Sequence, residues 1–207
     1  MRLLNVVDKL KDRLKYPLPG KESQFKMAPL IRRQENIDYD TKNSIKSSVL
    51  ILLFEKDNKT YLVFEKRNDY NGIHSKQICF PGGRVELCDK SYFETALRET
   101  YEEIGVEPDK INIIGEITQI YIPPSNYTVY PIIGYCTEEP NFNIDKQEVN
   151  NVIIIDLNYL LDENSIKTTT IETSYGKLIN TPYYDVKGEI VWGATAMILN
   201  EFLTLFR

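Results

Sequence analysis

The segment from residue 82 to residue 106 constrains the fold of this chain more than any other. It reads GGRVELCDKSYFETALRETYEEIGV and joins a Gly-Gly turn to a helical pattern. Ser91 is followed three residues later by Glu94, the spacing of a capping box at a helix start. Gly105 is a natural helix end, because glycine readily adopts the left-handed conformation. The segment therefore predicts a helix that begins after Ser91 and ends before Gly105.

This helix is predicted to pack on one face and to carry negative charge on another. Its apolar stripe consists of Phe93, Ala96, Leu97, Thr100 and Ile104, which recur at helical spacing. Glu99, Glu102 and Glu103 lie off that stripe and share one side of the helix. Crowded carboxylates repel one another unless a cation neutralises them, and hard divalent cations prefer such oxygen ligands. The spacing predicts a metal site with Mg2+ or Mn2+ as the cofactor.

Arg98 stands four residues before Glu102, so the two side chains are predicted to pair along the helix surface. Such a pair would hold Glu102 in one rotamer beside the metal. The alternative is an acidic, solvated helix face without a bound ion. The occurrence of the turn, the cap, the arginine and the carboxylates in this order disfavours that alternative.

Residues 83–106 resemble the Nudix box, a glycine, five residues, Glu, seven residues and then Arg-Glu-apolar-any-Glu-Glu-any-Gly-apolar. The second half matches at Arg98, Glu99, Glu102, Glu103, Gly105 and Val106. The first half departs, with Asp89 in place of Glu, one extra residue before Arg98, and Thr100 where an aliphatic residue is usual. The coenzyme A pyrophosphatase branch of the family resembles this chain in having the aspartate and the extra residue. It also has a Thr-Ala-Leu-Arg-Glu run, which here occupies residues 95–99.

The resemblance to this branch continues upstream, where residues 67–83 read RNDYNGIHSKQICFPGG. The matching positions are His74, Gln77, Phe80, Pro81, Gly82 and Gly83. Lys76 stands where the branch has glycine. Looser matches at residues 17–20, 27–29 and 192–196 extend the resemblance from about residue 17 to the C-terminus.

The predicted fold class is α/β of the α+β type, because the strands do not alternate regularly with helices as in a doubly wound sheet. Strands are predicted at residues 47–54, 60–66, 77–80, 111–121, 128–136, 152–156, 167–173, 182–185 and 189–191. A short helix or turn is expected at 157–161 and a final helix at 194–205. The resemblance implies the Nudix α/β/α sandwich with a mixed β-sheet.

The 207 residues are sufficient for a single domain overall, with an N-terminal helix and lead-in at 1–34 and the Nudix hydrolase domain at 35–207. The first twenty residues read as an amphipathic helix that packs on the domain, not as a signal peptide. No apolar run is long enough for a membrane span. The net charge of −5 argues against nucleic-acid binding. Cys79, Cys88 and Cys136 are an odd number without metal-site spacing and indicate reduced thiols in a cytoplasm. We expect a monomer or a homodimer.

The resemblance implies Mg2+-dependent hydrolysis of the diphosphate bond of coenzyme A or its derivatives, giving 3′,5′-ADP and 4′-phosphopantetheine. The implied catalytic residues are Arg98, Glu99, Glu102, Glu103 and Glu148, of which Glu99, Glu102 and Glu103 would bind the metal. The general base stays open between Glu148, His74 and the pair Glu102 or Glu103 acting on a water at the metal. Two alternative functions are hydrolysis of another nucleoside diphosphate derivative, such as ADP-ribose or NADH, and a non-catalytic module that senses a nucleotide.

The small-molecule partner is expected to be a coenzyme A-like nucleotide. The candidate substrate-binding residues are Arg67, His74, Lys76, Gln77, Gly82 and Gly83. The glycines let a phosphate approach the backbone closely, since they have no Cβ. Arg32, Arg33 and Lys66 are further candidates for phosphate contacts, with a solvated surface as the alternative. Asp89 and Glu86 are expected to form the turn or the helix cap. The aromatic residues between Tyr121 and Tyr130 are expected either to stack on an adenine base or to pack on a strand.

Overall fold

The computed structural model of the chain describes residues 1–34, 41–69, 77–172 and 178–207. Two of the predicted substrate-binding residues, His74 and Lys76, lie outside the described residues.

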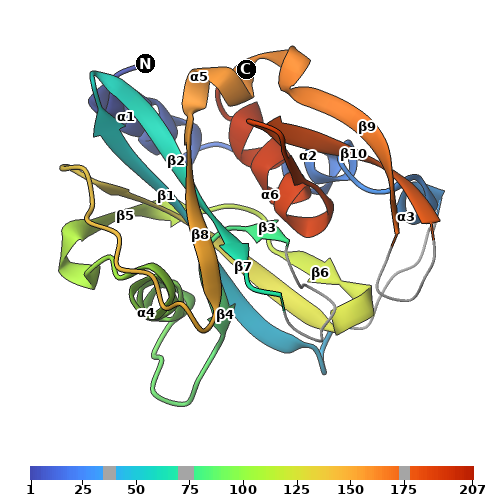
Figure 1. Ribbon diagram of the computed structural model, residues 1–207, viewed down its shortest axis with the longest axis horizontal. Coiled ribbons are helices and arrows are strands. Elements are labelled where there is room, and N and C mark those ends of the chain that lie inside the picture. The colour runs from blue at the N-terminus through green and yellow to red at the C-terminus, as the bar shows by residue number, and fades with distance from the viewer. Residues whose placement is uncertain (35–40, 70–76, 173–177) are drawn as a thin grey trace.

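A long hairpin and one parallel strand form the centre of the main sheet (Figure 1). Strands β1 (Ile45–Lys56) and β2 (Lys59–Arg67) pair antiparallel. Asp57 and Asn58 connect them with φ angles of 49° and 58°, the left-handed conformation that tight hairpin turns require. Strand β7 (Tyr127–Cys136) runs parallel to β1 along its length. The sheet is therefore mixed, as predicted.

The remaining strands of this sheet extend from the same centre. The sheet order is β3-β2-β1-β7-β5, with β3 at Ile78–Cys79 and β5 at Ile111–Glu116. Strand β4 (Gly82–Arg84) pairs with β1, β6 (Ile120–Ile122) with β7, and β8 (Val149–Asp156) with β2.

The prediction of one strand over residues 111–121 was wrong, because β5 and β6 are separated at residues 117–119. The reason is that the backbone of Thr118 is bonded to side chains instead of a neighbouring strand. Its N–H donates to the Glu201 carboxylate at 3.3 Å, and its carbonyl accepts from Gln24 at 2.8 Å. The chain leaves the sheet here to meet the helices behind it.

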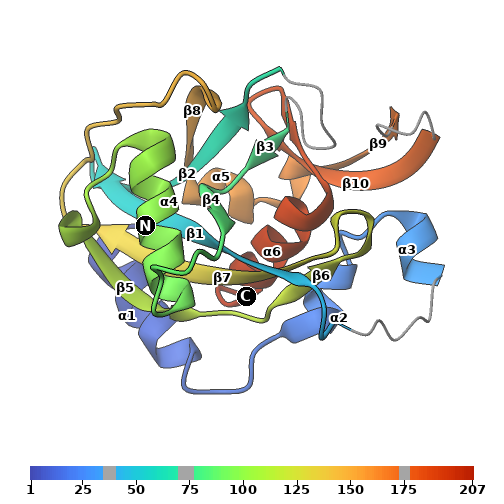
Figure 2. The same ribbon diagram turned by 90° about the horizontal axis from the view of Figure 1, so that it is seen from below.

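Helices cover both faces of the main sheet (Figure 2). Helices α1 (Leu3–Arg13), α2 (Gly20–Phe25) and α6 (Gly193–Thr204) lie on one face, and α4 (Tyr92–Ile104) lies on the other. Alternate residues of β1 fill the two cores, Ile51 and Leu53 on the α1 and α6 side, and Leu50, Leu52 and Phe54 on the α4 side. This arrangement is the predicted α/β/α sandwich.

A second, three-stranded antiparallel sheet follows the main one. It contains β9 (Ile166–Glu172), β10 (Leu178–Val186) and β11 (Glu189–Val191). Lys66 of β2 and Glu189 of β11 form an ion pair at 2.6 Å that links the two sheets. The sequence predicted these strands but not their separation into a sheet. The shorter elements are α3 (Leu30–Gln34), α5 (Leu157–Leu161), and 3-10 turns at Pro108–Lys110, Pro123–Ser125 and Glu163–Ser165.

The N-terminal lead-in is tied to the last helix by buried polar groups. Glu201 of α6 accepts from the Gly20 N–H at 3.0 Å and from the Gln24 amide at 2.7 Å. Asn200 donates to the Ser23 carbonyl at 2.7 Å and accepts from the Tyr184 hydroxyl at 2.7 Å. Because such buried groups are costly to leave unpaired, these contacts fix how α2 meets α6. The proposed boundary near residue 34 stays a prediction.

The amphipathic N-terminal helix is confirmed by the burial of Leu3, Val6, Val7 and Leu10. Among the helices of the described residues, none has the length and apolar character to cross a membrane.

We expect Leu10→Ala to lower the free energy of unfolding by about 2–5 kcal/mol, because it leaves a cavity between α1 and the sheet. Leu10 is fully buried, whereas Leu4 on the same helix is 68% exposed. Leu4→Ala is therefore the matched control and should change stability by less than about 0.5 kcal/mol. Urea unfolding of both variants measures the difference, and equal effects would show that α1 is not part of the core.

Candidate active site

Helix α4 begins and ends as its sequence predicts. The Ser91 hydroxyl accepts from the Glu94 N–H at 3.2 Å, and the Glu94 carboxylate accepts from the Lys90 N–H at 2.8 Å. Gly105 follows the helix with a φ of 72°, and its N–H bonds to the Tyr101 carbonyl. These contacts satisfy the free backbone groups at both ends and set which side chains face the sheet.

The predicted packing stripe is confirmed at Ala96, Thr100 and Ile104, which are buried. The prediction that all three glutamates lie away from the packed side was wrong for Glu103, which is only 2% exposed. Strand β4 approaches the helix so closely here that its backbone covers Glu103, and the Gly82 N–H donates to that carboxylate at 2.7 Å. Glu102, by contrast, has a side chain that is 54% exposed.

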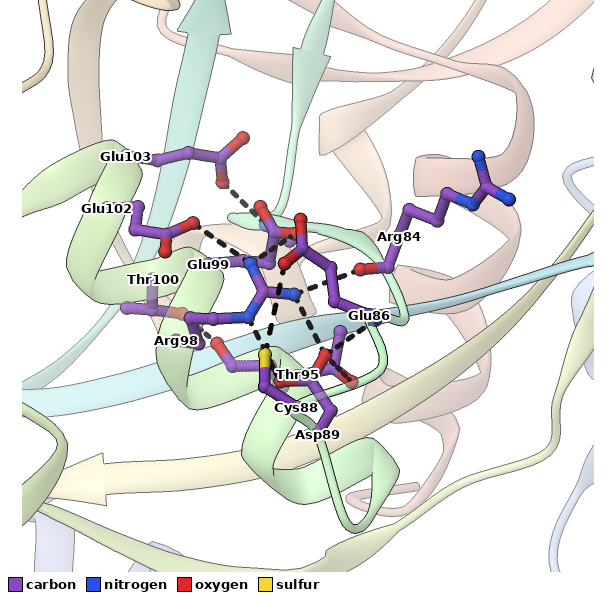
Figure 3. A network of polar contacts seen from close by, with 12 residues as sticks. Arg84, Glu86, Cys88, Asp89, Thr95, Arg98, Glu99, Thr100, Glu102 and Glu103 are labelled. Atoms are coloured by element: carbon purple, nitrogen blue, oxygen red, sulfur yellow. Dashed lines mark hydrogen bonds and ion pairs between the residues drawn. The ribbon is translucent and has the colours of Figure 1, made fainter.

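Arg98 connects the carboxylates of α4 to the preceding loop (Figure 3). Its guanidinium donates to both oxygens of Asp89, at 3.0 and 2.9 Å. It also donates to Glu99 and Glu102, each at 2.9 Å, and to the Arg84 carbonyl at 3.0 Å. The predicted pair between Arg98 and Glu102 is thereby confirmed. A single guanidinium holds the loop, the strand end and two of the candidate metal ligands.

Asp89 has the turn-forming role that its sequence position suggests, since its carboxylate accepts from the Glu86 N–H at 2.9 Å. It also accepts from the Thr95 hydroxyl at 2.9 Å. The pair with Arg98, together with these hydrogen bonds, holds the pKa of Asp89 well below its usual range. Asp89 is therefore a charged anchor for Arg98 as well as a turn residue.

Glu103 is held by an arginine from the neighbouring strand. Arg67 of β2 donates to Glu103 at 3.2 Å and to the Gly82 carbonyl at 3.3 Å. Its side chain is 30% exposed. The structure shows that Arg67 fixes Glu103 against β4, while its predicted contact with a substrate phosphate stays a prediction.

Two polar residues below the helix, Glu65 and Cys79, were not predicted from the sequence to be part of the site. Cys79 accepts from Arg67 at 3.4 Å and donates to Glu65 at 3.2 Å. Glu65 is fully buried, and its second oxygen has no hydrogen-bond partner within the described part of the chain. The available signal was the position of Glu65, a carboxylate directly after the apolar run Leu62-Val63-Phe64.

The pKa values of Glu103 and Glu99 are raised chiefly by burial. Burial raises the pKa of Glu103, the nearby Glu65 raises it further, and Arg67 opposes the shift. Burial also raises the pKa of Glu99, against the effect of Arg98, and the charges of Glu102 and Glu148 add to it. Glu148 is thus close enough to act electrostatically on Glu99 although it lies in an exposed loop. Its role as a general base stays a prediction.

The donor set fits a hard divalent cation in its chemistry, because Glu99, Glu102 and Glu103 supply carboxylate oxygens, the ligands that such cations prefer. In the part of the chain that the structure describes, no three acidic, histidine or cysteine side chains converge on one point as a ready-made metal site. Arg98 and Arg67 instead occupy one oxygen of each of these carboxylates. A bound cation would therefore compete with, or add to, these arginine contacts.

The two glycines of β4 allow the close contact with α4. A Cβ at Gly83 would lie 2.4 Å from the carboxyl carbon of Glu99, and Gly82 has a φ of 151°. Gln77 lies directly before β3, and its carbonyl accepts from the Arg67 N–H at 3.0 Å. Gly82 is thus required by the protein's own packing, and Gly83 leaves the space that the Glu99 carboxylate occupies. A direct contact of these residues with a substrate stays a prediction.

The additional phosphate candidates do not gather at the carboxylates. Lys66 pairs with Glu189, Arg32 donates to the Tyr121 carbonyl, and Arg33 donates to the carbonyls of Ala28 and Lys26. In the aromatic segment, the ring of Tyr130 stacks on Tyr92 with 3.6 Å between ring centroids. This contact packs the first turn of α4 against β7.

Comparison with known proteins now identifies the family. Residues 45–169 match the NUDIX domain, which is more than half of the chain. The chain belongs to the Nudix family. It is 30% identical over 173 residues to Nudix hydrolase 3 of Caenorhabditis elegans, covering 76% of this chain and 72% of that protein. The predicted enzyme class, a Nudix pyrophosphohydrolase that acts on nucleoside diphosphate derivatives, is confirmed.

Two further comparisons bear on the substrate and the fold. The mouse peroxisomal coenzyme A diphosphatase NUDT7 is 31% identical over 123 residues, which span 59% of this chain but only about half, 52%, of the mouse protein. The crystal structure of a MutT/nudix family protein from Enterococcus faecalis superposes with a TM-score of 0.53 at 15% identity, covering 90% of this chain and 73% of that one. The predicted Nudix fold is confirmed.

We expect Glu103→Gln to reduce turnover by at least about 100-fold, because a neutral amide cannot supply the negative charge that a metal ligand would carry once the cation is bound. The fold should persist, since the amide has the same shape and burial disfavours the charged form of Glu103. Glu94→Gln, an exposed change on the same helix that preserves the cap, is the control and should keep full activity. Steady-state rates and thermal melting measure both effects, and a wild-type rate in Glu103→Gln would refute the metal assignment.

Gly83→Ala should raise the Mg2+ concentration for half-maximal activity by about 10–100-fold, because the added methyl group displaces Glu99. Stability should change little, since the atoms in the way belong to the end of a flexible side chain. A Mg2+ titration of activity measures the effect. The same change in a Glu99→Ala background is the control and should have no further effect, whereas equal shifts in both backgrounds would mean that Gly83 acts independently of Glu99.

Proposed function

We propose that this protein hydrolyses the diphosphate bond of coenzyme A or its derivatives and releases 3′,5′-ADP and 4′-phosphopantetheine. The observation that carries the proposal is the place of Asp89. The coenzyme A branch differs from the general Nudix pattern by this aspartate and by the extra residue that follows it. Here both carboxylate oxygens of Asp89 accept from Arg98, so the longer loop ends in an ordered ion pair at the active site. The similarity to the mouse coenzyme A diphosphatase supports the same substrate.

The reaction adds one water molecule across the bridge. The water oxygen bonds to one phosphorus, the bond between that phosphorus and the bridging oxygen breaks, and each product keeps one of the two phosphates of the bridge. The 3′-phosphate stays on the ADP product. Glu99, Glu102 and Glu103 are the proposed ligands of Mg2+ or Mn2+, which when bound would neutralise the diphosphate and favour ionisation of the attacking water. Arg98 orients Glu99 and Glu102 for this task, and Arg67 together with the Gly82 N–H orients Glu103.

We propose Glu148 as the general base. It lies in an exposed loop, and its negative charge acts on both Glu99 and Glu65. It makes no ion pair with the arginines that hold the other carboxylates in the described structure. A carboxylate that is close to the metal ligands and open to solvent can accept the proton of the attacking water and pass it to bulk solvent.

The non-catalytic alternative predicts that the carboxylates of α4 are dispensable, which the construction of this site disfavours. Arg98 and Arg67 hold Glu99, Glu102 and Glu103 beside β4. A module that only senses a nucleotide does not need three carboxylates held in this way. A cytoplasmic location and a monomeric or dimeric state remain expectations from the sequence.

Product analysis tests the proposed substrate. We expect purified protein with Mg2+ or Mn2+ to form 3′,5′-ADP from coenzyme A faster than it cleaves ADP-ribose, NADH or a nucleoside triphosphate. Anion-exchange chromatography separates the products. Faster cleavage of another compound would reject coenzyme A as the preferred substrate, and tight nucleotide binding without any turnover would instead favour the sensing module.

A further inference from the structure

We infer that Arg84 determines substrate specificity by binding a phosphate monoester of the substrate that lies apart from the diphosphate bridge. The inference rests on the proposed function, in which this group is the 3′-phosphate of coenzyme A. Arg84 was not among the residues singled out from the sequence.

The backbone of Arg84 is held firmly at the edge of the active site. Arg84 is the last residue of β4 and pairs with Ser47 of β1. Its carbonyl accepts from Arg98 at 3.0 Å, and the next N–H, that of Val85, donates to the Lys46 carbonyl at 3.0 Å. The residue is therefore anchored to the same guanidinium that orders Glu99 and Glu102.

The side chain of Arg84, in contrast, is exposed and has no bonding partner among the described residues. Figure 3 shows it extending away from Arg98 and the carboxylates, although its carbonyl points toward them. A guanidinium has five N–H donors and cannot lose its charge at physiological pH. An arginine on an ordered strand with all five donors available is well prepared to bind an anion.

Three other cations near the site, among the described residues, are engaged by carboxylates of the protein. Arg98 donates to three carboxylates, Arg67 donates to Glu103, and Lys66 pairs with Glu189. Arg84 thus differs from these residues in having its charge available to a substrate.

The direction of the side chain indicates which phosphate it meets. The bridge must lie beside Glu99 and Glu102, because the cation that these carboxylates attract has to contact it. Arg84 leaves the strand in a different direction from that cluster. Its guanidinium is therefore placed for a second phosphate on the same substrate. A terminal phosphate carries nearly two charges at neutral pH and offers three oxygens, so it suits bidentate contact with arginine.

The test compares coenzyme A with dephospho-coenzyme A, which lacks only the 3′-phosphate. We expect Arg84→Ala to raise the KM for coenzyme A by about 10–100-fold, while its kcat and both constants for dephospho-coenzyme A change less than about twofold. Arg84→Lys should recover part of the loss, because it keeps the charge without the bidentate geometry. Lys90→Ala removes an exposed positive charge from the adjoining loop and controls for a general effect of net charge.

Three results would overturn the inference. The first is an equal rise in the KM of Arg84→Ala for coenzyme A and dephospho-coenzyme A. The second is a fall in its kcat without a change in KM, and the third is no change in either constant. The proposed function is judged separately by the wild-type protein. If wild-type protein cleaves dephospho-coenzyme A at least as efficiently as coenzyme A, the role of Arg84 is refuted while hydrolysis of coenzyme A derivatives stands. If it cleaves neither, the proposed function fails before any variant is compared.

Discussion

The active site depends most on the bidentate ion pair between Arg98 and Asp89. Without a fixed partner, the long arginine side chain would lose conformational entropy each time it met Glu99 or Glu102. Asp89 supplies that fixed partner, because it is itself bound by the Glu86 N–H and the Thr95 hydroxyl. The loop before α4 therefore orients an arginine, and the arginine in turn orients two carboxylates on the helix.

A second constraint comes from charge beneath the helix. Glu103 and Glu65 are both buried, and among the described residues Arg67 is the one cation that pairs with them. Such an arrangement is unfavourable for stability, since burial penalises each charge more than one partner restores. It is suited to a site that attracts a divalent cation. A bound divalent cation would offset the buried negative charge, so the unfavourable electrostatics are consistent with the metal-dependent chemistry of the family.

The sequence predicted those features that depend on local spacing. The ends of α4, the pair between Arg98 and Glu102, and the turn at Asp89 all involve residues within ten positions of one another. It failed where distant segments decide the outcome. Glu103 is buried because β4 covers it, and β5 ends because Glu201, more than eighty residues away, binds the Thr118 N–H. Neither contact leaves a trace in the spacing of either segment alone.

The same distinction explains why the cations were harder to assign than the carboxylates. Every arginine and lysine near the Gly-Gly turn had the correct charge for a phosphate, and the sequence offers no means of telling which are already paired. The structure divides them by partner. Arg67 and Arg98 are engaged by carboxylates of the protein, so their charge organises the metal ligands, whereas the guanidinium of Arg84 extends away from that cluster. Around β4, two arginines therefore hold the candidate metal ligands, and a third, Arg84, has its positive charge available to the substrate.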